Sequence, residues 1–395
     1  MPAPRRIIVL GSTGSIGTAT LEVVRHLRES GGPSYEVVGL AAGSNAARVA
    51  AQAEAFGVRH VALSDPASAS TLPAGIECFA GDGAATELVE RVARPGDMVM
   101  ASIVGAAGIA PTLAAIERGC HVALANKETL VAAGAVVREA VARRGIDLIP
   151  VDSEHSAVFQ CLRAGRTSEV ARLVLTASGG PFRTWSAERT RDATLAEALR
   201  HPTWQMGRKV TIDSASLMNK ALEVIEAHWL FDLPSSRIDA IVHPQSIVHS
   251  FVEFRDGSTI AQLSPPSMRL PIQYALTFPD RVAGCCPTMG WDGMRSLDFE
   301  PVDHERFPAI RLAKRVIDAG GSAGAVFNAA NEVAVEAFVA GSLRFGDIPA
   351  IVAEALDALE AGPAGSLGEV LAADAAARGF ARERVAARAA AGRFA

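Results

Sequence analysis

A short acidic segment offers the clearest chemistry in this sequence. Asp152-Ser153-Glu154-His155 directly follows an apolar run that we expect to be a strand. Residues two apart in an extended chain point to the same side, so we expect both carboxylates to face one site. Facing carboxylates repel each other unless a cation binds them, and oxygen ligands favour Mg²⁺ or Mn²⁺ over zinc. The alternative is an exposed acidic turn without a ligand.

Lysine is rare in this chain, which makes each lysine informative. Of the 38 Lys and Arg residues, only four are lysines, namely Lys127, Lys209, Lys220 and Lys314. A compact ammonium can serve a reacting oxygen in a way that a planar guanidinium cannot. Lys127 stands in Ala125-Asn126-Lys127-Glu128, just beyond an expected strand, and we expect it to contact the substrate. The start of a surface helix is the alternative.

A second polar cluster has helical spacing. Asn219, Lys220, Glu223 and Glu226 are three or four residues apart, so they share one face of a helix. Asn219 and Lys220, with Ser214 before them, offer donors that suit a phosphate group. Glu223 is a candidate for a third metal carboxylate. The alternative is an ordinary solvated face of lysine and glutamate.

Two further segments have features of a ligand site: one of a turn that binds phosphate, the other of a lid that covers a substrate. Ser178-Gly179-Gly180-Pro181 follows an expected strand and is a candidate anion-binding turn, although a plain β-turn fits equally well. Residues 201–209 (HPTWQMGRK) include Pro and Gly, which favours a mobile lid whose Trp204 and Met206 cover a substrate. The alternative for both side chains is packing against the core.

A glycine-rich segment near the N-terminus predicts a dinucleotide site. Gly11-Ser12-Thr13-Gly14-Ser15-Ile16-Gly17 lies between an expected strand and an expected helix, although its spacing is GxxGxxG and not GxGxxG. After the second strand come Gly43-Ser44-Asn45 and then Arg48. No Asp or Glu stands there to hold the ribose 2′-hydroxyl of NAD. The sequence therefore predicts NADPH as the cofactor.

The elements that must position these residues follow from the apolar pattern. Over residues 1–151, short apolar runs alternate with helical patterns, which predicts an α/β fold with a Rossmann-like, doubly wound parallel sheet. The expected strands are 7–10, 35–40, 98–102, 121–124 and 147–151, and the expected helices between them are 18–28 and 46–56.

The pattern of the remaining residues predicts two more domains and a linker between them. Residues 152–278 predict an α+β catalytic domain, with a strand at 173–176 and a hairpin of 250–254 and 259–263. Residues 279–308 predict a linker. Residues 309–395 predict a C-terminal helical domain, with helices at 309–319, 325–339, 348–359 and 372–390.

Composition excludes several classes of protein. A net charge of −5 provides no basic stripe for a nucleic acid, and no apolar run approaches the ~20 residues that span a bilayer. The five cysteines are odd in number and lack CxxC spacing, which indicates free thiols in a reducing cytoplasm. We therefore expect a cytoplasmic enzyme with small-molecule ligands and no nucleic-acid or membrane partner.

Taken together, these motifs resemble one family nearly from end to end. GSTGSIG (11–17), ANKE (125–128), PVDSEH (150–155), SGGPF (178–182), HPTWQMGRK (201–209), DSASLMNKALEVIEA (213–227), HPQSIVHS (243–250) and NAANE (328–332) occur in order. The chain is similar to the 1-deoxy-D-xylulose 5-phosphate reductoisomerases. The resemblance implies NADPH, Mg²⁺ or Mn²⁺, a sugar phosphate substrate, and a homodimer. The implied reaction yields 2-C-methyl-D-erythritol 4-phosphate by skeletal rearrangement and hydride transfer.

The resemblance also implies roles, position by position. The implied cofactor contacts are Thr13, Gly14, Ser15, Ile16, Gly43, Ser44, Asn45, Asn126, Glu128 and Gly207. The implied metal ligands are Asp152, Glu154 and Glu223. The implied substrate contacts are Lys127, Ser153, Glu154, Ser178, His201, Trp204, Met206, Ser214, Asn219, Lys220 and Glu223. The implied catalytic residues are Lys127, Glu154, His155 and His249.

Two other functions remain as alternatives. An NADP-dependent aldehyde or semialdehyde dehydrogenase with a covalent step needs a nucleophilic cysteine, and none of the five stands in such a motif. A nucleotide sensor without catalysis is the other alternative.

Overall fold

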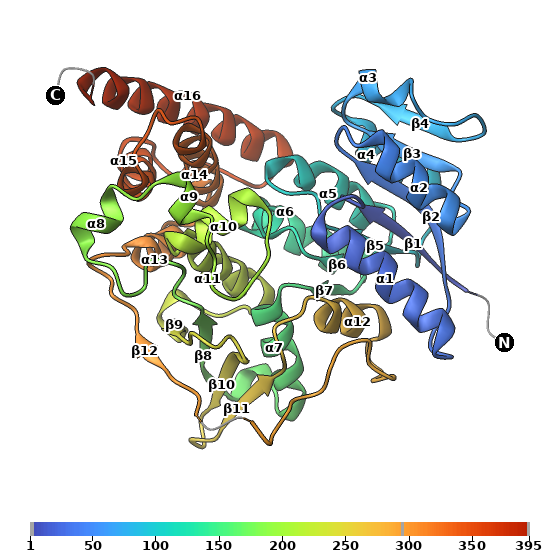
Figure 1. The fold of residues 1–395 in the computed structure, drawn as a ribbon, viewed down its shortest axis with the longest axis horizontal. Coiled ribbons are helices and arrows are strands. Elements are labelled where there is room, and N and C mark those ends of the chain that lie inside the picture. The colour runs from blue at the N-terminus through green and yellow to red at the C-terminus, as the bar shows by residue number, and fades with distance from the viewer. Residues whose placement is uncertain (1–3, 294–295, 393–395) are drawn as a thin grey trace. The chain divides into compact units, whose positions relative to one another are not determined.

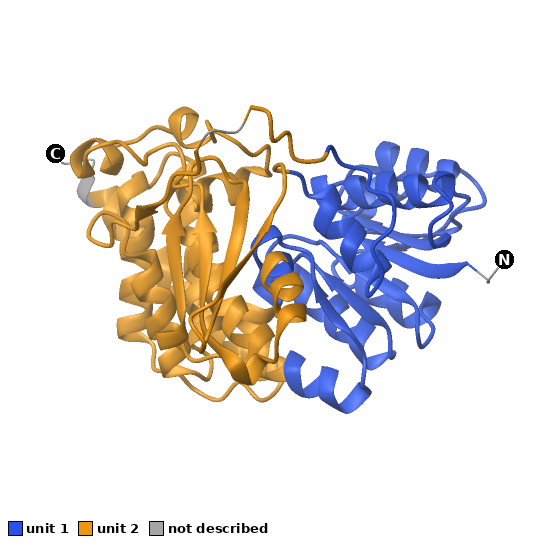
Figure 2. Cartoon of the chain, turned by 90° about the horizontal axis from the view of Figure 1, so that it is seen from below, with its two compact units in different colours: residues 1–129, 137–156, 267–287 blue, residues 130–136, 157–266, 288–395 orange. Residues whose placement is uncertain are grey.

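The computed structural model describes residues 4–293 and 296–392. Contacts within these residues define two compact units, each of which draws on separate stretches of the chain (Figure 2). Unit 1 contains the chain up to residue 129 together with 137–156 and 267–287. Unit 2 contains 130–136, 157–266 and the chain from residue 288 onward. The four-part division expected from the sequence stays a prediction, and its linker includes residues 294 and 295, which lie outside the described residues.

Unit 1 is built on a seven-stranded parallel sheet with the order β4-β3-β2-β1-β5-β6-β7 (Figure 1). Its strands are β1 (Arg5–Leu10), β2 (Tyr35–Ala42), β3 (His60–Leu63), β4 (Glu77–Ala80), β5 (Met98–Ala101), β6 (His121–Leu124) and β7 (Leu148–Pro150). The order reverses at β1, which pairs with β2 on one side and with β5 on the other. In open α/β sheets such a reversal forms the crevice that binds a ligand.

Helices connect these strands. They are α1 (Ser15–Glu29), α2 (Ala46–Phe56), α3 (Pro66–Ala69), α4 (Ala84–Val92), α5 (Ile109–Glu117) and α6 (Lys127–Arg144). A distant segment, α12 (Arg269–Thr277), also belongs to unit 1. It is fastened by the Tyr35 hydroxyl, which donates to the Leu276 carbonyl, and by an ion pair between Arg269 and Glu22.

Unit 2 contains a five-stranded sheet with the order β11-β10-β8-β9-β12. The strands are β8 (Val170–Ala177), β9 (Ile238–Val242), β10 (Val248–Phe254), β11 (Thr259–Leu263) and β12 (Glu300–Pro301). Only β8 and β9 among these neighbours are parallel, so the sheet is mixed. Helix α7 (Ser153–Cys161) begins in unit 1 and continues into unit 2.

The remaining helices belong to unit 2. They are α8 (Ala187–Arg191), α9 (Leu195–Ala198), α10 (Arg208–Ala215), α11 (Met218–Phe231), α13 (Ala309–Ala319), α14 (Ala323–Val339), α15 (Ile348–Ala358) and α16 (Leu367–Gly392). The short 3₁₀ helices η2 (Leu162–Ala164), η3 (Thr167–Glu169), η4 (Ser235–Arg237) and η5 (Phe345–Asp347) also belong to unit 2, whereas η1 (Ala106–Gly108) belongs to unit 1. The helical part near the C-terminus, α13 to α16, confirms the expected helical region.

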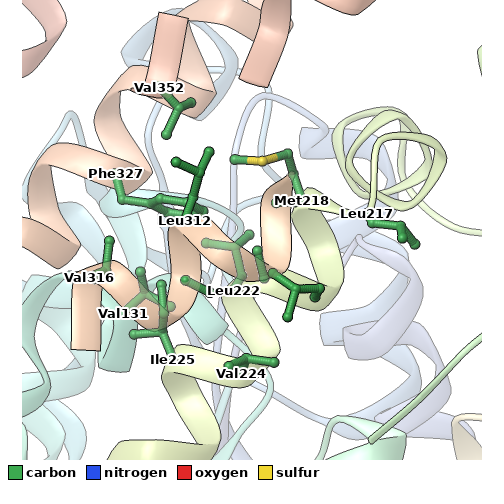
Figure 3. Packing of buried hydrophobic residues seen from close by; sticks show 14 of the residues in the cluster. Val131, Leu217, Met218, Leu222, Val224, Ile225, Leu312, Val316, Phe327 and Val352 are labelled. Carbon is green, nitrogen blue, oxygen red and sulfur yellow. The ribbon is translucent and has the colours of Figure 1, made fainter. Parts of the chain in front are cut away.

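The core of unit 2 surrounds α11. Figure 3 shows Leu222 and Ile225 of this helix among Leu312 and Val316 of α13 and Phe327 of α14. All five side chains are nearly or fully buried. Helix α11 is therefore held from several sides, which fixes the polar residues that it carries.

The expected elements are confirmed for the most part. Helices 46–56 and 309–319 have the predicted bounds, and the hairpin of β10 and β11 is present. Strands β3 and β4 were not predicted, because they are four residues each and too short for a clear apolar period. None of the helices in the described part of the chain combines the length and apolar character that a membrane crossing requires.

Candidate active site

The glycine-rich segment forms a tight turn between β1 and α1. Gly11 has φ of 84°, and a Cβ there would lie 2.6 Å from the Ser102 carbonyl oxygen. A Cβ on Gly17 would lie 2.3 Å from the carbonyl oxygen of Gly11, so the first turn of α1 rests directly on the loop. Gly14 is the N-cap residue, and Thr13, Ser15 and Ile16 flank it. The N–H groups of this first turn are suited to a pyrophosphate.

The end of β2 carries the residues expected to select the cofactor. The Asn45 side chain accepts a hydrogen bond of 3.0 Å from the Arg48 backbone N–H and so caps α2. The Arg48 guanidinium donates to Thr18 Oγ1 at 3.0 Å, which holds it beside the first turns of α1. Gly43 and Ser44 precede this cap, and no acid stands among the three residues. The arrangement leaves a positive group and small donors at this strand end.

Asn126 and Glu128 organise the end of β6. Asn126 caps α6 by accepting from the Thr129 N–H at 2.9 Å, and its amide donates to Glu128 at 2.9 Å and to the Gly105 carbonyl at 3.1 Å. Both residues are buried. Their side chains are committed to the protein, so their expected role in cofactor binding stays a prediction. The same holds for Gly207, the N-cap residue of α10 in unit 2.

The acidic segment lies after β7, but it is not extended. Helix α7 begins at Ser153, so Glu154 lies in its first turn and Asp152 just before it. The expectation that both carboxylates project from an extended chain is therefore wrong. Asp152 and Glu154 therefore lie at the N-terminus of α7, where the partial positive charge of the helix dipole favours carboxylates. Ser153 Oγ donates to Glu154.

Lys127 meets the acidic segment within unit 1. Its Nζ lies 2.9 Å from Asp152 Oδ2, and His155 Nδ1 lies 3.5 Å from the same oxygen. Lys127 and His155 are buried, with 8% and 0% of the residue exposed. Lys127 is thus part of a shielded charge cluster, and the alternative of a surface helix start does not describe it.

The second polar cluster lies on α11 and is not solvated. Lys220, Glu223 and Glu226 are buried, with 4%, 1% and 1% exposed. Glu223 accepts from both Asn219 and Lys220. The alternative of an ordinary solvated face is therefore excluded, because these charges are shielded by the core around α11. Ser214 lies at the end of the preceding helix, α10.

His201 and Ser178 form one hydrogen-bonded unit. His201 Nδ1 accepts from the backbone N–H groups of Thr203 at 3.1 Å and Trp204 at 2.8 Å, so the ring proton lies on Nε2. Nε2 is 2.9 Å from Ser178 Oγ, which also accepts from the Gly180 N–H at 3.2 Å. Burial lowers the pKa of His201 to about 4. The neutral ring therefore leaves the serine hydroxyl proton free to point to an anion.

Ser178 opens onto a hollow of about 360 Å³. Three arginines, Arg183, Arg189 and Arg200, line this hollow together with one acidic residue, Glu197. The excess of guanidinium groups favours an anionic group near Ser178.

The predicted lid and His249 belong to unit 2 as well. Trp204 and Met206 lie in an irregular segment before α10, and both are partly buried. The Trp204 ring lies 6.2 Å from the ring of His249, centroid to centroid. His249 is 4% exposed and lies 3.0 Å from Ser264 Oγ through Nε2. The segment thus covers one side of a buried histidine.

A buried carboxylate in α10 was not predicted as a site residue. Asp213 is 1% exposed, and its oxygens accept from Lys209 Nζ at 2.8 Å and from the Asn331 amide at 2.9 Å. The motifs that contain Asp213 and Asn331 were the available signal. Their separation of 118 residues explains why no local pattern joins them.

Comparisons with known proteins cover almost the whole chain. Residues 7–134 match the model described as 1-deoxy-D-xylulose 5-phosphate reductoisomerase. Residues 148–231 match its C-terminal domain model, and residues 263–380 match a further model described as the DXP reductoisomerase C-terminal domain.

Curated relatives carry the same description. The protein of Nocardia farcinica is 52% identical over 96% of this chain and 94% of its own length. That of Chlorobium chlorochromatii is 51% identical over 96% of this chain and 99% of its own. Both are described as 1-deoxy-D-xylulose 5-phosphate reductoisomerase.

Solved structures agree in fold. The reductoisomerase of Zymomonas mobilis in complex with NADPH is 41% identical, covers 97% of this chain and 99% of its own, and has a TM-score of 0.87. A second DOX-P reductoisomerase structure, in complex with NADPH, fosmidomycin and magnesium, is 35% identical. It covers 96% of this chain and 98% of its own, with a TM-score of 0.89.

Proposed function

The chain belongs to the 1-deoxy-D-xylulose 5-phosphate reductoisomerase family, and we propose that the residues described above carry out that family's reaction. The protein is an NADPH-dependent oxidoreductase that converts 1-deoxy-D-xylulose 5-phosphate to 2-C-methyl-D-erythritol 4-phosphate, a step towards isoprenoid precursors. The observation that carries this conclusion is 52% identity over 96% of the chain to a relative of that description. The comparisons support this function and not the alternatives of a semialdehyde dehydrogenase or a nucleotide sensor.

The donors present in the chain fit the two cofactors. NADPH suits the glycine loop, whose Gly11 and Gly17 allow backbone to approach closely, and the acid-free strand end beside Arg48. Magnesium suits carboxylate oxygens. We propose Asp152, Glu154 and Glu223 as its ligands.

The cofactors and the protein divide the chemistry between them. Magnesium and NADPH, when bound, supply Lewis-acid polarisation of the substrate oxygens and the hydride that reduces the rearranged aldehyde. The Lys127 ammonium, held by Asp152 at 2.9 Å, donates to the substrate oxygen that gains negative charge. Ser153 binds the substrate, and Glu154 and His155 assist proton movement at that end. We propose His249 as a further proton-transfer group.

A separate set of donors binds the substrate phosphate. We propose Ser178, Ser214, Asn219 and Lys220 as its direct contacts, with His201 orienting Ser178 through the hydrogen bond of 2.9 Å. Trp204 and Met206 exclude water from the reacting end. Binding energy from the phosphate holds the rearranging fragments in register.

We propose that two copies of the chain pair through the outer face of the unit 2 sheet. Val174, Ile241 and Phe251 are only partly buried, although strands β8, β9 and β10 are central to this sheet. A half-buried apolar strip flanked by the Arg172–Glu253 ion pair suits a self-complementary contact. A cytoplasmic location accords with the five free cysteines.

The experiment that tests the function follows NADPH absorbance with 1-deoxy-D-xylulose 5-phosphate. We expect oxidation of one NADPH per substrate molecule with magnesium, and none after EDTA. Mass spectrometry of the product distinguishes 2-C-methyl-D-erythritol 4-phosphate from a simple reduction product. Absence of metal-dependent oxidation contradicts the proposal.

A further inference from the structure

Helix α10 connects the segments that we assign to the substrate phosphate. Ser214 lies on it, and the chain passes from it directly into α11, which carries Asn219 and Lys220. The turn after β8 rests on it too, since a Cβ on Gly180 would lie 2.9 Å from the Ser214 carbonyl oxygen. A small movement of α10 therefore shifts Ser214 relative to the other proposed phosphate contacts.

Asp213 fastens this helix from the side of the core. Its carboxylate is buried next to Ser214 in sequence and accepts from Lys209 at 2.8 Å and from Asn331 at 2.9 Å. Lys209 belongs to the first turn of the same helix, whereas Asn331 belongs to α14. A buried carboxylate is stable only when such partners satisfy it. Asn331 therefore ties α10 to the C-terminal helices.

Helix α14 is itself fixed by α16. Arg378 of α16 donates to Glu332 at 2.6 Å and to Asp374 at 2.6 Å. Glu332 follows Asn331 directly, and the Asn328 amide also donates to it at 3.1 Å. Of these bonds, only the charge-assisted bond between Arg378 and Glu332 joins the two helices, so it restrains the rotation of α14 about its axis and with it the direction of the Asn331 amide.

We propose that Asn331 and Lys209, acting through Asp213, are positioning residues for the substrate phosphate site, and that this gives the C-terminal helices a role in substrate binding. The inference rests on the proposed function. A carboxylate fixed on two sides keeps α10 in place, and with it Ser214, against the turn that carries Ser178. Lys209, one of the four lysines, is thereby assigned to Asp213 and not to direct contact with the phosphate.

The burial of Asn331 supports a positioning role. The residue is fully buried, and its Oδ1 accepts no hydrogen bond from the described residues. For stability alone, an apolar residue would be better at this position, because burying an amide whose oxygen has no hydrogen bond costs free energy. The amide contributes what an apolar residue lacks, namely a directed donor for Asp213.

The test compares Asn331→Ala with Asn328→Ala. Both amides are fully buried on α14, but that of Asn328 donates to Glu332 on its own helix. For Asn331→Ala we expect the KM for 1-deoxy-D-xylulose 5-phosphate to rise about tenfold, the loss expected for a hydrogen bond to a charged group. The KM for NADPH and kcat should stay within about twofold. Competitive inhibition by inorganic phosphate should weaken by the same factor as substrate binding.

Asn328→Ala provides the matched control. It should lower Tm comparably and leave the substrate KM unchanged, because it loses a buried bond without freeing α10. If both variants lower only Tm, Asn331 has a purely structural role and the proposal is overturned. Because wild-type turnover is measured first, a failure of the proposed function is distinguished from a failure of this inference.

Two more variants cover the case in which Asn331→Ala does not fold. Lys209→Met alters the partly exposed member of the set and should also raise the substrate KM and the inhibition constant of phosphate. The exchange Asp213→Asn with Asn331→Asp restores an amide–carboxylate pair in reverse and should recover substrate KM relative to Asn331→Asp alone. No recovery, together with an unchanged KM in Lys209→Met, overturns the proposal.

Discussion

Lys127 and Asp152 form an ion pair at the ends of two adjacent parallel strands, with 2.9 Å between Nζ and Oδ2. Lys127 opens α6 after β6, and Asp152 stands between β7 and α7. Their side chains are only 10% and 16% exposed, so water screens the pair weakly. The lysine is therefore held next to a proposed metal ligand before any substrate binds.

Replacing Lys127 tests whether this ammonium serves the reaction. For Lys127→Ala we expect kcat to fall by roughly 10²–10³-fold, the usual effect of removing one donor to a developing oxyanion. Lys314→Ala is the matched control, because Lys314 also pairs with an aspartate, Asp239, at 2.7 Å but lies on α13. Steady-state kinetics measure both. A kcat for Lys127→Ala within about twofold of wild type contradicts the assigned role.

The sequence predicted the parts of this site that local patterns encode. Continuous apolar runs that end just before Gly11 and Lys127 locate the carboxyl ends of two strands. Because these ends share one edge of a parallel sheet, the residues that follow them were expected near the ligands. The acidic segment was predicted to be extended, which is wrong, because a helix that starts at Ser153 has little apolar period. The pairing of Asp213 with Asn331 was also inaccessible, because it depends on tertiary packing between distant helices.

Replacing Glu223 tests whether it is one of the metal ligands. The side chain is buried and contacts Lys220 and Asn219, so Glu223→Gln keeps the shape and removes the charge. We expect the magnesium concentration for half-maximal rate to rise more than about tenfold. NADPH binding, followed by fluorescence, should not change. Glu336→Gln, at an exposed position of α14, is the control, and an equal magnesium requirement in both variants argues against Glu223 as a ligand.

Gly17 tests the close approach of α1 to the glycine loop. A Cβ at this position meets the Gly11 carbonyl oxygen at 2.3 Å, so Gly17→Ala must displace the loop. We expect a loss of about 1–3 kcal/mol in the free energy of unfolding and a weaker affinity for NADPH. Gly83→Ala, where nothing lies within 4 Å of the added Cβ, should have neither effect. Denaturant titration and fluorescence binding measure the two quantities, and equal behaviour of the variants contradicts the prediction.

Arg48 tests how the chain recognises the 2′-phosphate of NADPH. Its guanidinium is fixed to Thr18 Oγ1 at 3.0 Å beside Ser44 and Asn45. For Arg48→Ala we expect the KM for NADPH to rise by roughly tenfold or more, the effect of losing a charge-assisted bond. The kcat/KM with NADH should stay the same. Arg59→Ala, at an exposed position before β3, is the control. An equal loss with both cofactors means that Arg48 does not contact the 2′-phosphate.

The lowered pKa of His201 makes the stability of the folded protein depend on pH. Burial lowers its pKa to about 4, below the ordinary value near 6.5, so the folded protein resists protonation that the unfolded chain accepts. The stabilisation is therefore complete above pH 6.5 and is lost as pH falls towards 4. In His201→Gln this contribution is absent, so Tm should fall less steeply between pH 6.5 and 4 than in wild type. Parallel slopes in calorimetric scans of the two proteins contradict the assignment of a neutral His201, and with it the orientation proposed for Ser178.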